Sequence, residues 1–288
     1  MRERETGGGT LRILIRTSKW AIWARRLGSV AVPLVIISVV LHRFRLITSD
    51  LFLAAALAAG IVALLALLVA MIALARLWQT GDQGWTRALT GLVFGLLCLL
   101  PFAWYGNLAI RYPAVTDIAT TDRGLMPLVF EPGTAAMPPP KMLTPAQLTA
   151  TFPNVETRTY PLGQAQTFAL VEGLVEANGW DIRLSREPSE TLDPAQINAQ
   201  IMTIPGWREE AVLRVTGTAT TAVVDMRSAS LNALHDFGSN GLRIEAFLTA
   251  LDDAVTTLLR DNPNANQPVE ADTDAETDTA PVDDSPPA

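Results

Sequence analysis

The densest group of potentially reactive side chains lies in "VVDMRSASLNALHDFGSNGLRIEAF", residues 223–247. This short stretch carries two arginines, three serines and His235, the only histidine of the chain besides His42. Such side chains can act as nucleophile and base, can bind an anion, or can form the hydrogen bonds that hold a turn in place. Three hypotheses therefore follow from the same residues.

A serine hydrolase would use Ser228 or Ser230 as the nucleophile, His235 as the base and Asp236 as the orienting acid. Two observations weaken this hypothesis. The neighbours His235 and Asp236 would have to face the same way in a turn, and the stretch has no G-x-S-x-G elbow. The hydrolase is therefore kept as the alternative, and no residue is assigned as catalytic.

An anion or lipid-headgroup site would use Arg227, at the end of a predicted strand, and Arg243, at the start of a predicted helix. The loop between them could bring both guanidinium groups and the helix N-terminus to one place. A structural role is the competing hypothesis. It pairs Asp236 with Arg243 and places Asp225 and Arg227 on one strand face.

In the structural hypothesis, Asp236, Ser239 or Asn240 caps the last helix, and Gly238 and Gly241 permit the preceding turn. Both the binding and the structural hypotheses use one set of residues. This ligand-binding or structural signature consists of Arg227, Ser228, Ser230, Asp236, Gly238, Asn240 and Arg243.

The signature is preceded in the chain by predicted transmembrane segments. Residues 51–75 carry no charge and are long enough to cross a hydrocarbon core of about 30 Å. Residues 88–110 form a second span, and residues 27–47 form a third in which His42, Arg43 and Arg45 must reach toward the interface. The alternative for 27–47 is an interfacial segment beside a two-span hairpin. Residues 1–26 form a basic flank that we expect in the cytoplasm.

The distribution of cations predicts the orientation. A cytoplasmic N-terminus places nine Lys and Arg residues on the inner side and three on the outer side, and inner loops are normally the richer in cations. The inner set is Arg2, Arg4, Arg12, Arg16, Lys19, Arg25, Arg26, Arg76 and Arg87, and the outer set is Arg43, Arg45 and Arg111. With three spans, the C-terminal domain lies in the periplasm or outside the cell, anchored in a bacterial inner (plasma) membrane.

Residues 111–260 are enough for one domain with its own core. The sequence predicts helices at 164–178 and 240–260, and strands at 180–187, 196–204, 211–215 and 221–228. In 196–204, Ile197, Ala199 and Ile201 alternate with polar residues, as in a half-buried strand. The expected fold class is α+β: three transmembrane helices followed by a soluble domain with an antiparallel sheet covered by helices on one side. The acidic, proline-containing tail 261–288 is expected to be disordered.

Composition excludes several functions. Residues 1–110 hold eleven Lys and Arg against four Asp and Glu, whereas residues 111–288 hold eleven against 25, so the domain is too acidic to bind nucleic acid. Cys98 is the only cysteine and histidines are scarce, which argues against a disulfide, a metal centre or another cofactor. The partners we expect are the lipid bilayer and an envelope protein or lipid. The sequence predicts no oligomeric state.

The signature resembles a known family. "VDMRSASLNALHDFGSNGLRIEAFL" is similar to the signature of bacterial and plastid proteins of domain-of-unknown-function family 1499, in which RSxS precedes D-[LF]-G-x-N-x-x-R-I. "YPAVTDIATT", residues 112–121, resembles the entry segment of the membrane-anchored members. In "WREEAVLRV", residues 207–215, Glu209 and Glu210 stand where the family has an acidic pair before a strand.

The resemblance covers about residues 112–260 and implies the fold, while the family name records no activity. We therefore expect an envelope protein of non-enzymatic, binding or structural type, with the membrane-tethered hydrolase as the alternative.

Overall fold

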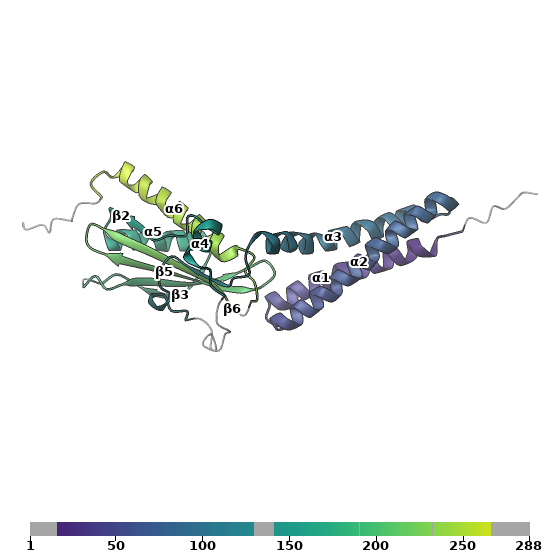
Figure 1. The fold of residues 1–288 in the computed structure, drawn as a ribbon, viewed down its shortest axis with the longest axis horizontal. Helices are drawn as coiled ribbons and strands as arrows, with labels where there is room; N and C mark the ends of the chain where they lie inside the picture. Colours follow the sequence, from purple (N-terminus) through teal and green to yellow (C-terminus); the bar gives the residue numbers. More distant parts are fainter. Residues whose placement is uncertain (1–15, 130–140, 190, 232, 266–288) are drawn as a thin grey trace, which may run out of the picture.

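The computed structural model describes residues 16–129, 141–189, 191–231 and 233–265. A bundle of three long helices and a separate α+β domain lie end to end, as Figure 1 shows. The helices are α1 (Lys19–Arg43), α2 (Ser49–Thr80) and α3 (Trp85–Arg111). The remainder of the flank, residues 1–15, and residues 266–288 of the predicted acidic tail lie outside the described residues.

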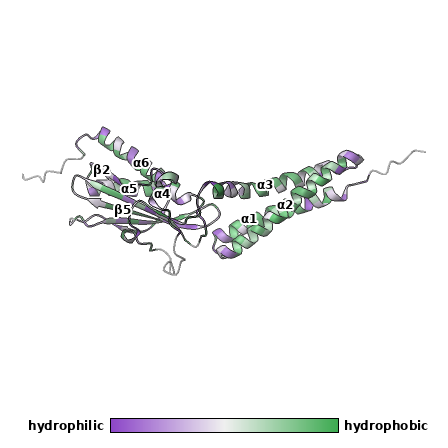
Figure 2. Ribbon diagram, viewed as in Figure 1, coloured by the Kyte–Doolittle hydropathy of each residue, from purple (hydrophilic) through white to green (hydrophobic). Residues whose placement is uncertain are grey.

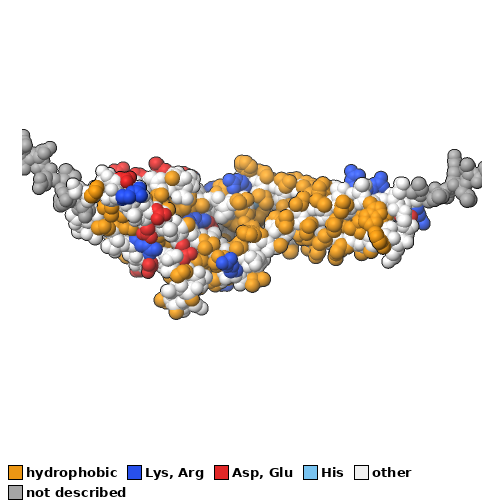
Figure 3. Space-filling view, turned by 90° about the horizontal axis from the view of Figure 1, so that it is seen from above, with side chains coloured by type: hydrophobic (Ala, Val, Ile, Leu, Met, Phe, Trp, Pro, Cys, Tyr) orange, Lys and Arg blue, Asp and Glu red, His pale blue; other side chains and the backbone are white. Residues whose placement is uncertain are grey.

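Each of the three helices is long and apolar enough to cross a bilayer, which confirms the predicted membrane part. Their outer surfaces carry large apolar side chains, and Figures 2 and 3 show this hydrophobic covering along the bundle. Small residues face one another inside it, among them Ala24, Ala31, Ala63 and Ala66. In the region of the predicted first span, 27–47, α1 ends at Arg43, and Arg45 lies in the turn to α2 with a φ of 61°.

The domain contains a six-stranded antiparallel sheet. Its strands are β1 (Asp117–Ala119), β2 (Arg158–Tyr160), β3 (Asp181–Arg186), β4 (Ala195–Met202), β5 (Arg208–Gly217) and β6 (Ala222–Leu231). The order is β1-β6-β5-β4-β3, and β2 also pairs with β6. The short elements are the 3-10 turn η1 (Arg123–Leu125) and α4 (Pro145–Thr151), and the long helices are α5 (Gln164–Ala177) and α6 (Ser239–Asp261).

The main core lies between the sheet and the helices α5 and α6, which cover one face (Figure 1). Ile197, Leu213 and Met226 point from the sheet into this core and meet Ile244 and Leu248 of α6. The antiparallel sheet with helices on one side is therefore confirmed. Burying an aliphatic side chain of this size contributes about 1.5–3 kcal/mol, so the α6 face is held mainly by apolar contact.

The prediction that β4 is half-buried was wrong. All five residues from 195 to 199 are buried, including the polar side chain of Asn198. The reason is that the segment after β1 crosses the second face of the sheet, where the Asn198 amide donates to the Pro127 carbonyl at 3.1 Å and to Glu210 at 2.7 Å. In β4 the apolar residues therefore face the core beneath the helices, and Asn198 faces a second buried region in which it has polar partners.

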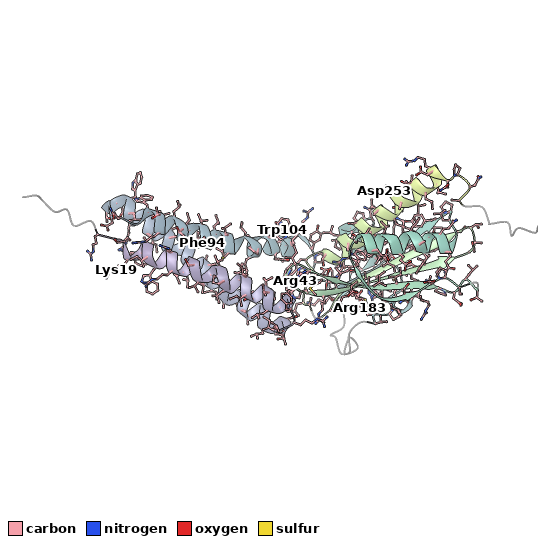
Figure 4. All side chains as sticks on the ribbon, turned by 180° about the vertical axis from the view of Figure 1, so that it is seen from behind. Lys19, Arg43, Phe94, Trp104, Arg183 and Asp253 are labelled. Atoms are coloured by element: carbon pink, nitrogen blue, oxygen red, sulfur yellow. The ribbon has the colours of Figure 1, made fainter. Side chains whose placement is uncertain are left out.

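The domain contacts the bundle through the turn between β4 and β5, residues 203–207. His42 at the end of α1 lies 2.7 Å from the Pro205 carbonyl, and Arg43 donates to the Thr203 carbonyl at 3.0 Å. Gly206 has a φ of 97°, and a Cβ there would lie 2.7 Å from the Cα of Arg43. Only glycine therefore permits this approach. Figure 4 shows Arg43 at the domain end of the bundle and Lys19 at the far end.

Candidate functional site

The signature lies where β6 ends and α6 begins, next to the bundle. A short turn reverses the chain, so the first turn of α6 passes back beside the end of β6. Phe237 and Gly238 adopt positive φ angles of 55° and 82°, and the Asp236 carboxylate accepts a hydrogen bond from the Gly238 amide at 3.0 Å. A Cβ on Gly238 would lie 2.6 Å from the ring of Tyr112, so the turn closes tightly on the chain leaving α3.

Asn240 is the centre of the polar contacts on the α6 side. Its side chain is fully buried. The amide nitrogen donates to Ser230 at 3.0 Å, to Asp236 at 3.0 Å and to the Thr116 carbonyl at 3.2 Å. The amide oxygen accepts from Ser228 at 2.8 Å and from Arg243 at 3.2 Å. Asn240 thus ties α6 to β6 and to the segment before β1.

Arg243 pairs with Glu209 of β5. The other Glu209 oxygen accepts hydrogen bonds from Ser230 at 2.9 Å and Ser239 at 2.6 Å. Glu209 stands opposite Ser230 in the β5–β6 register, which puts its carboxylate on the same face as that serine. Because Asp236 is turned toward Gly238 and Asn240, the expected pairing of Asp236 with Arg243 is replaced by this buried ion pair.

Arg227 lies on the opposite face of β6. Its guanidinium pairs with both carboxylate oxygens of Asp117 at 3.1 and 2.7 Å, and it donates to the Met126 carbonyl at 2.7 Å. Asp225, two residues earlier, instead accepts from Thr120 and Thr157. The sheet therefore separates the two arginines, and the convergence of both guanidinium groups on one ligand is not formed.

The structure thus brings Ser228, Ser230, Asp236, Gly238, Asn240 and Arg243 together on the α6 side and places Arg227 on the other side. His235 stacks on Phe237 with ring centroids 4.6 Å apart and accepts a hydrogen bond from the Phe237 amide at 2.9 Å. Among the described residues, the serine hydroxyls bond to Asn240 and Glu209 rather than to His235.

Comparison with known proteins finds the family that the signature resembles. Residues 134–251 match DUF1499. That family is described as a protein of unknown function. The DUF1499 region runs from before α4 into the middle of α6, so it contains Glu209 and the whole signature, whereas Asp117 lies before it. No curated protein matches the chain.

Two acids that complete the network were not among the predicted site residues. Glu209, inside the DUF1499 region, was noted only as part of the acidic pair in "WREEAVLRV", and Asp117 lies in "YPAVTDIATT". Both are buried opposite an arginine. The available signal was the position of each acid beside a predicted strand or extended segment, since a carboxylate that becomes buried there requires a partner. Within the described ranges, no group of three or more His, Cys, Asp and Glu side chains is arranged to hold a metal ion.

Burial raises the pKa of the Asp236 carboxyl, and the hydrogen bonds from Gly238 and Asn240 offset this only in part, while Glu209 raises it further. The folded protein therefore binds this proton more tightly than the unfolded chain does. By linkage, the free energy of unfolding falls as pH rises from the ordinary aspartate pKa of about 3.9 through the folded pKa. The stabilisation that protonated Asp236 gives is fully present below this window and lost above it.

We predict that Asp236→Asn, which cannot ionise, removes this dependence. The free energy of unfolding of the wild type should fall relative to the variant as pH rises from about 4 toward neutral. Pulse proteolysis of the full-length protein in detergent over this pH range measures the difference. Asp253→Asn, at an exposed position of α6 (Figure 4), is the control. Parallel curves for the wild type and Asp236→Asn would contradict the prediction.

Proposed function

We propose that the protein is a non-enzymatic module of the bacterial envelope. Its three helices anchor it in the inner membrane with the N-terminus in the cytoplasm, and its domain stands outside the cytoplasm, where it binds a lipid or another anionic ligand. One observation carries the proposal. The serine, arginine and acidic side chains of the signature form hydrogen bonds and ion pairs within the domain, whereas a pocket lined by arginines lies at the junction between bundle and domain.

The signature acts in this proposal as a scaffold. The Glu209–Arg243 and Asp117–Arg227 pairs have arginine side chains that are only 14% and 11% exposed. Charges held this closely and hydrogen-bonded to several neighbours are poor sites for an additional ligand, because a new anion would have to displace a buried carboxylate. The first pair fixes α6 against one face of the sheet, and the second ties β1 to β6 on the opposite face.

The placement of cations supports the orientation. The end of the bundle that meets the domain carries Arg43, Arg45 and Arg111, whereas the remaining membrane-flanking cations gather at the opposite end. Excess cations favour the cytoplasmic side. The domain is therefore assigned to the periplasmic or extracellular side. The same assignment places the junction at the outer headgroup layer of the inner membrane.

Two measurements test the proposal. A reporter that is active only outside the cytoplasm, fused after Arg260, should be active, and the full-length protein should not react with a fluorophosphonate probe. Cytoplasmic reporter activity would contradict the orientation. Labelling that disappears in Ser228→Ala or Ser230→Ala and also in His235→Ala would contradict the non-enzymatic assignment and support a tethered hydrolase.

A further inference from the structure

Two hollows lie side by side at the junction of bundle and domain. The first is an apolar cavity of about 220 Å³ between the domain ends of the three helices and the domain itself. Val39, Ala56 and Phe102 line it from the helices, and Trp207 and Phe237 line it from the domain. The second is a polar pocket of about 260 Å³ lined by Arg45, Arg208 and Ser49. Trp207 borders both hollows.

The apolar cavity lies at the depth of lipid chains. The uncharged run 51–75 of α2 is longer than a hydrocarbon core of about 30 Å requires at 1.5 Å per residue, so Ala56 falls within that core near its outer edge. The neighbouring outer surfaces of Leu53 and Phe102 are exposed and would face lipid. A cavity that joins such a surface is open to an acyl chain from the bilayer.

The polar pocket lies beside the apolar cavity, and Arg45 and Arg208 give its lining positive charge. Arg45 is held in the turn after α1 with a left-handed backbone, a conformation that costs a side-chain-bearing residue free energy. Burial lowers the pKa of Arg208, and the charge of Arg45 lowers it further, so the two cations repel one another. An anion bound between them would relieve this repulsion. His42 and the Ser49 hydroxyl, 3.2 Å apart, add polar groups on the same wall.

The domain side of the junction is also shaped for a membrane surface. The turn 203–207 carries Ile204, which is 85% exposed, and the turn after α1 carries the exposed side chains of Phe44 and Leu46. Trp207 ends the turn 203–207, with its ring 5.6 Å from that of Phe52 and 6.1 Å from that of Tyr105. Aromatic rings with a polar edge prefer the boundary between headgroups and chains.

We propose that the two hollows together bind one phospholipid with an anionic headgroup. The headgroup phosphate lies between Arg45 and Arg208, and one acyl chain enters the apolar cavity past Trp207. The inference deepens the proposed function and rests on its placement of the junction at the outer headgroup layer. Neither hollow alone selects this ligand: the apolar cavity would accept any chain, and the cations would accept any small anion.

The test is native mass spectrometry of the full-length protein after equilibration with vesicles of phosphatidylglycerol and phosphatidylcholine in equal amounts with identical acyl chains. The wild type should retain phosphatidylglycerol preferentially. Arg45→Gln and Arg208→Gln should each reduce this preference roughly fivefold, the effect of one interfacial cation, without reducing total bound lipid. Arg183→Gln, an exposed arginine on β3, is the charge-matched control and should leave the preference unchanged.

A second set of variants tests the apolar cavity by filling it with a larger side chain. Ala56→Phe should reduce retention of both lipids several-fold, whereas Ala54→Phe, at an exposed position of the same helix, should not. Equal effects of the two phenylalanines, or an unchanged preference in both glutamine variants, would overturn the proposal. Displacement of the retained lipid by millimolar inorganic phosphate would also overturn it, since a headgroup held only by its charge exchanges with the free anion.

These outcomes are separate from those that test the proposed function. Topology and serine reactivity are measured without lipid retention, so a failed lipid site leaves the external, non-enzymatic assignment standing. A cytoplasmic reporter signal would instead remove the placement on which the site depends.

Discussion

Arg243→Ala should lower the free energy of unfolding of the domain by about 3–5 kcal/mol, because it leaves the Glu209 carboxylate buried without its counter-charge. Glu209 is only 2% exposed, so its carboxylate depends on protein groups rather than on solvent for compensation. The serine hydroxyls that also bond to Glu209 carry no charge and compensate only in part. Pulse proteolysis of the full-length protein in detergent at neutral pH measures the change.

The control for this prediction is Arg183→Ala. Arg183 also pairs with a carboxylate, that of Asp181, but both side chains are more than half exposed, and such pairs contribute about 0–1 kcal/mol. Adding Glu209→Gln to Arg243→Ala should recover part of the lost stability, since it removes the orphaned charge. A loss below about 1 kcal/mol in Arg243→Ala would show that the pair is dispensable.

Asn240→Asp should lower the free energy of unfolding by about 2–4 kcal/mol at neutral pH although it changes hardly any volume. The amide nitrogen points at oxygen atoms of Thr116, Ser230 and Asp236. A carboxylate oxygen in that place cannot donate to any of them, and it brings a second negative charge beside Asp236. The remaining contact with Arg243 recovers only part of this cost.

The loss should shrink at low pH. The new carboxyl is buried beside another acid, so its pKa is raised, and below that pKa the protonated group can again donate a hydrogen bond. Unfolding measured from neutral to acidic pH should show the variant approaching the wild type. Asn154→Asp, at an exposed position, should stay within about 0.5 kcal/mol of the wild type throughout. A constant difference for Asn240→Asp would refute the donor argument.

The sequence predicted the elements that have long, regular patterns. The uncharged run 51–75 and the apolar face of α6 each dictate a helix without reference to the rest of the chain. The short strands β1 and β2, three residues each, were not predicted, because they are defined by pairing with β6 rather than by their own composition.

In the candidate site, too, the sequence predicted what depends on local pattern and missed what depends on contacts between distant segments. Its residue set came from one stretch, but the partner of each arginine came from another part of the chain: Asp117 is 110 positions from Arg227, and Glu209 is 34 from Arg243. A single sequence favours near neighbours such as Asp236, since it contains no measure of distance across strands. The sequence could not predict the two junction hollows for the same reason, because their lining comes from three helices, three connecting turns and the strands β5 and β6.

The glycine turn between β4 and β5 has a mechanical consequence. If α3 were the only connection, the domain would be tethered at one point and free to swivel above the membrane. The seat of Gly206 on the end of α1 provides a second fixed point, and the ring of Trp207 against Phe52 of α2 provides a third. Contacts to all three helices restrain the swivel of the domain more than the α3 connection alone would. Gly206 and Trp207 lie within three residues of Glu209, so a tilt of α1 or α2 would act on the strand that holds the Arg243 ion pair.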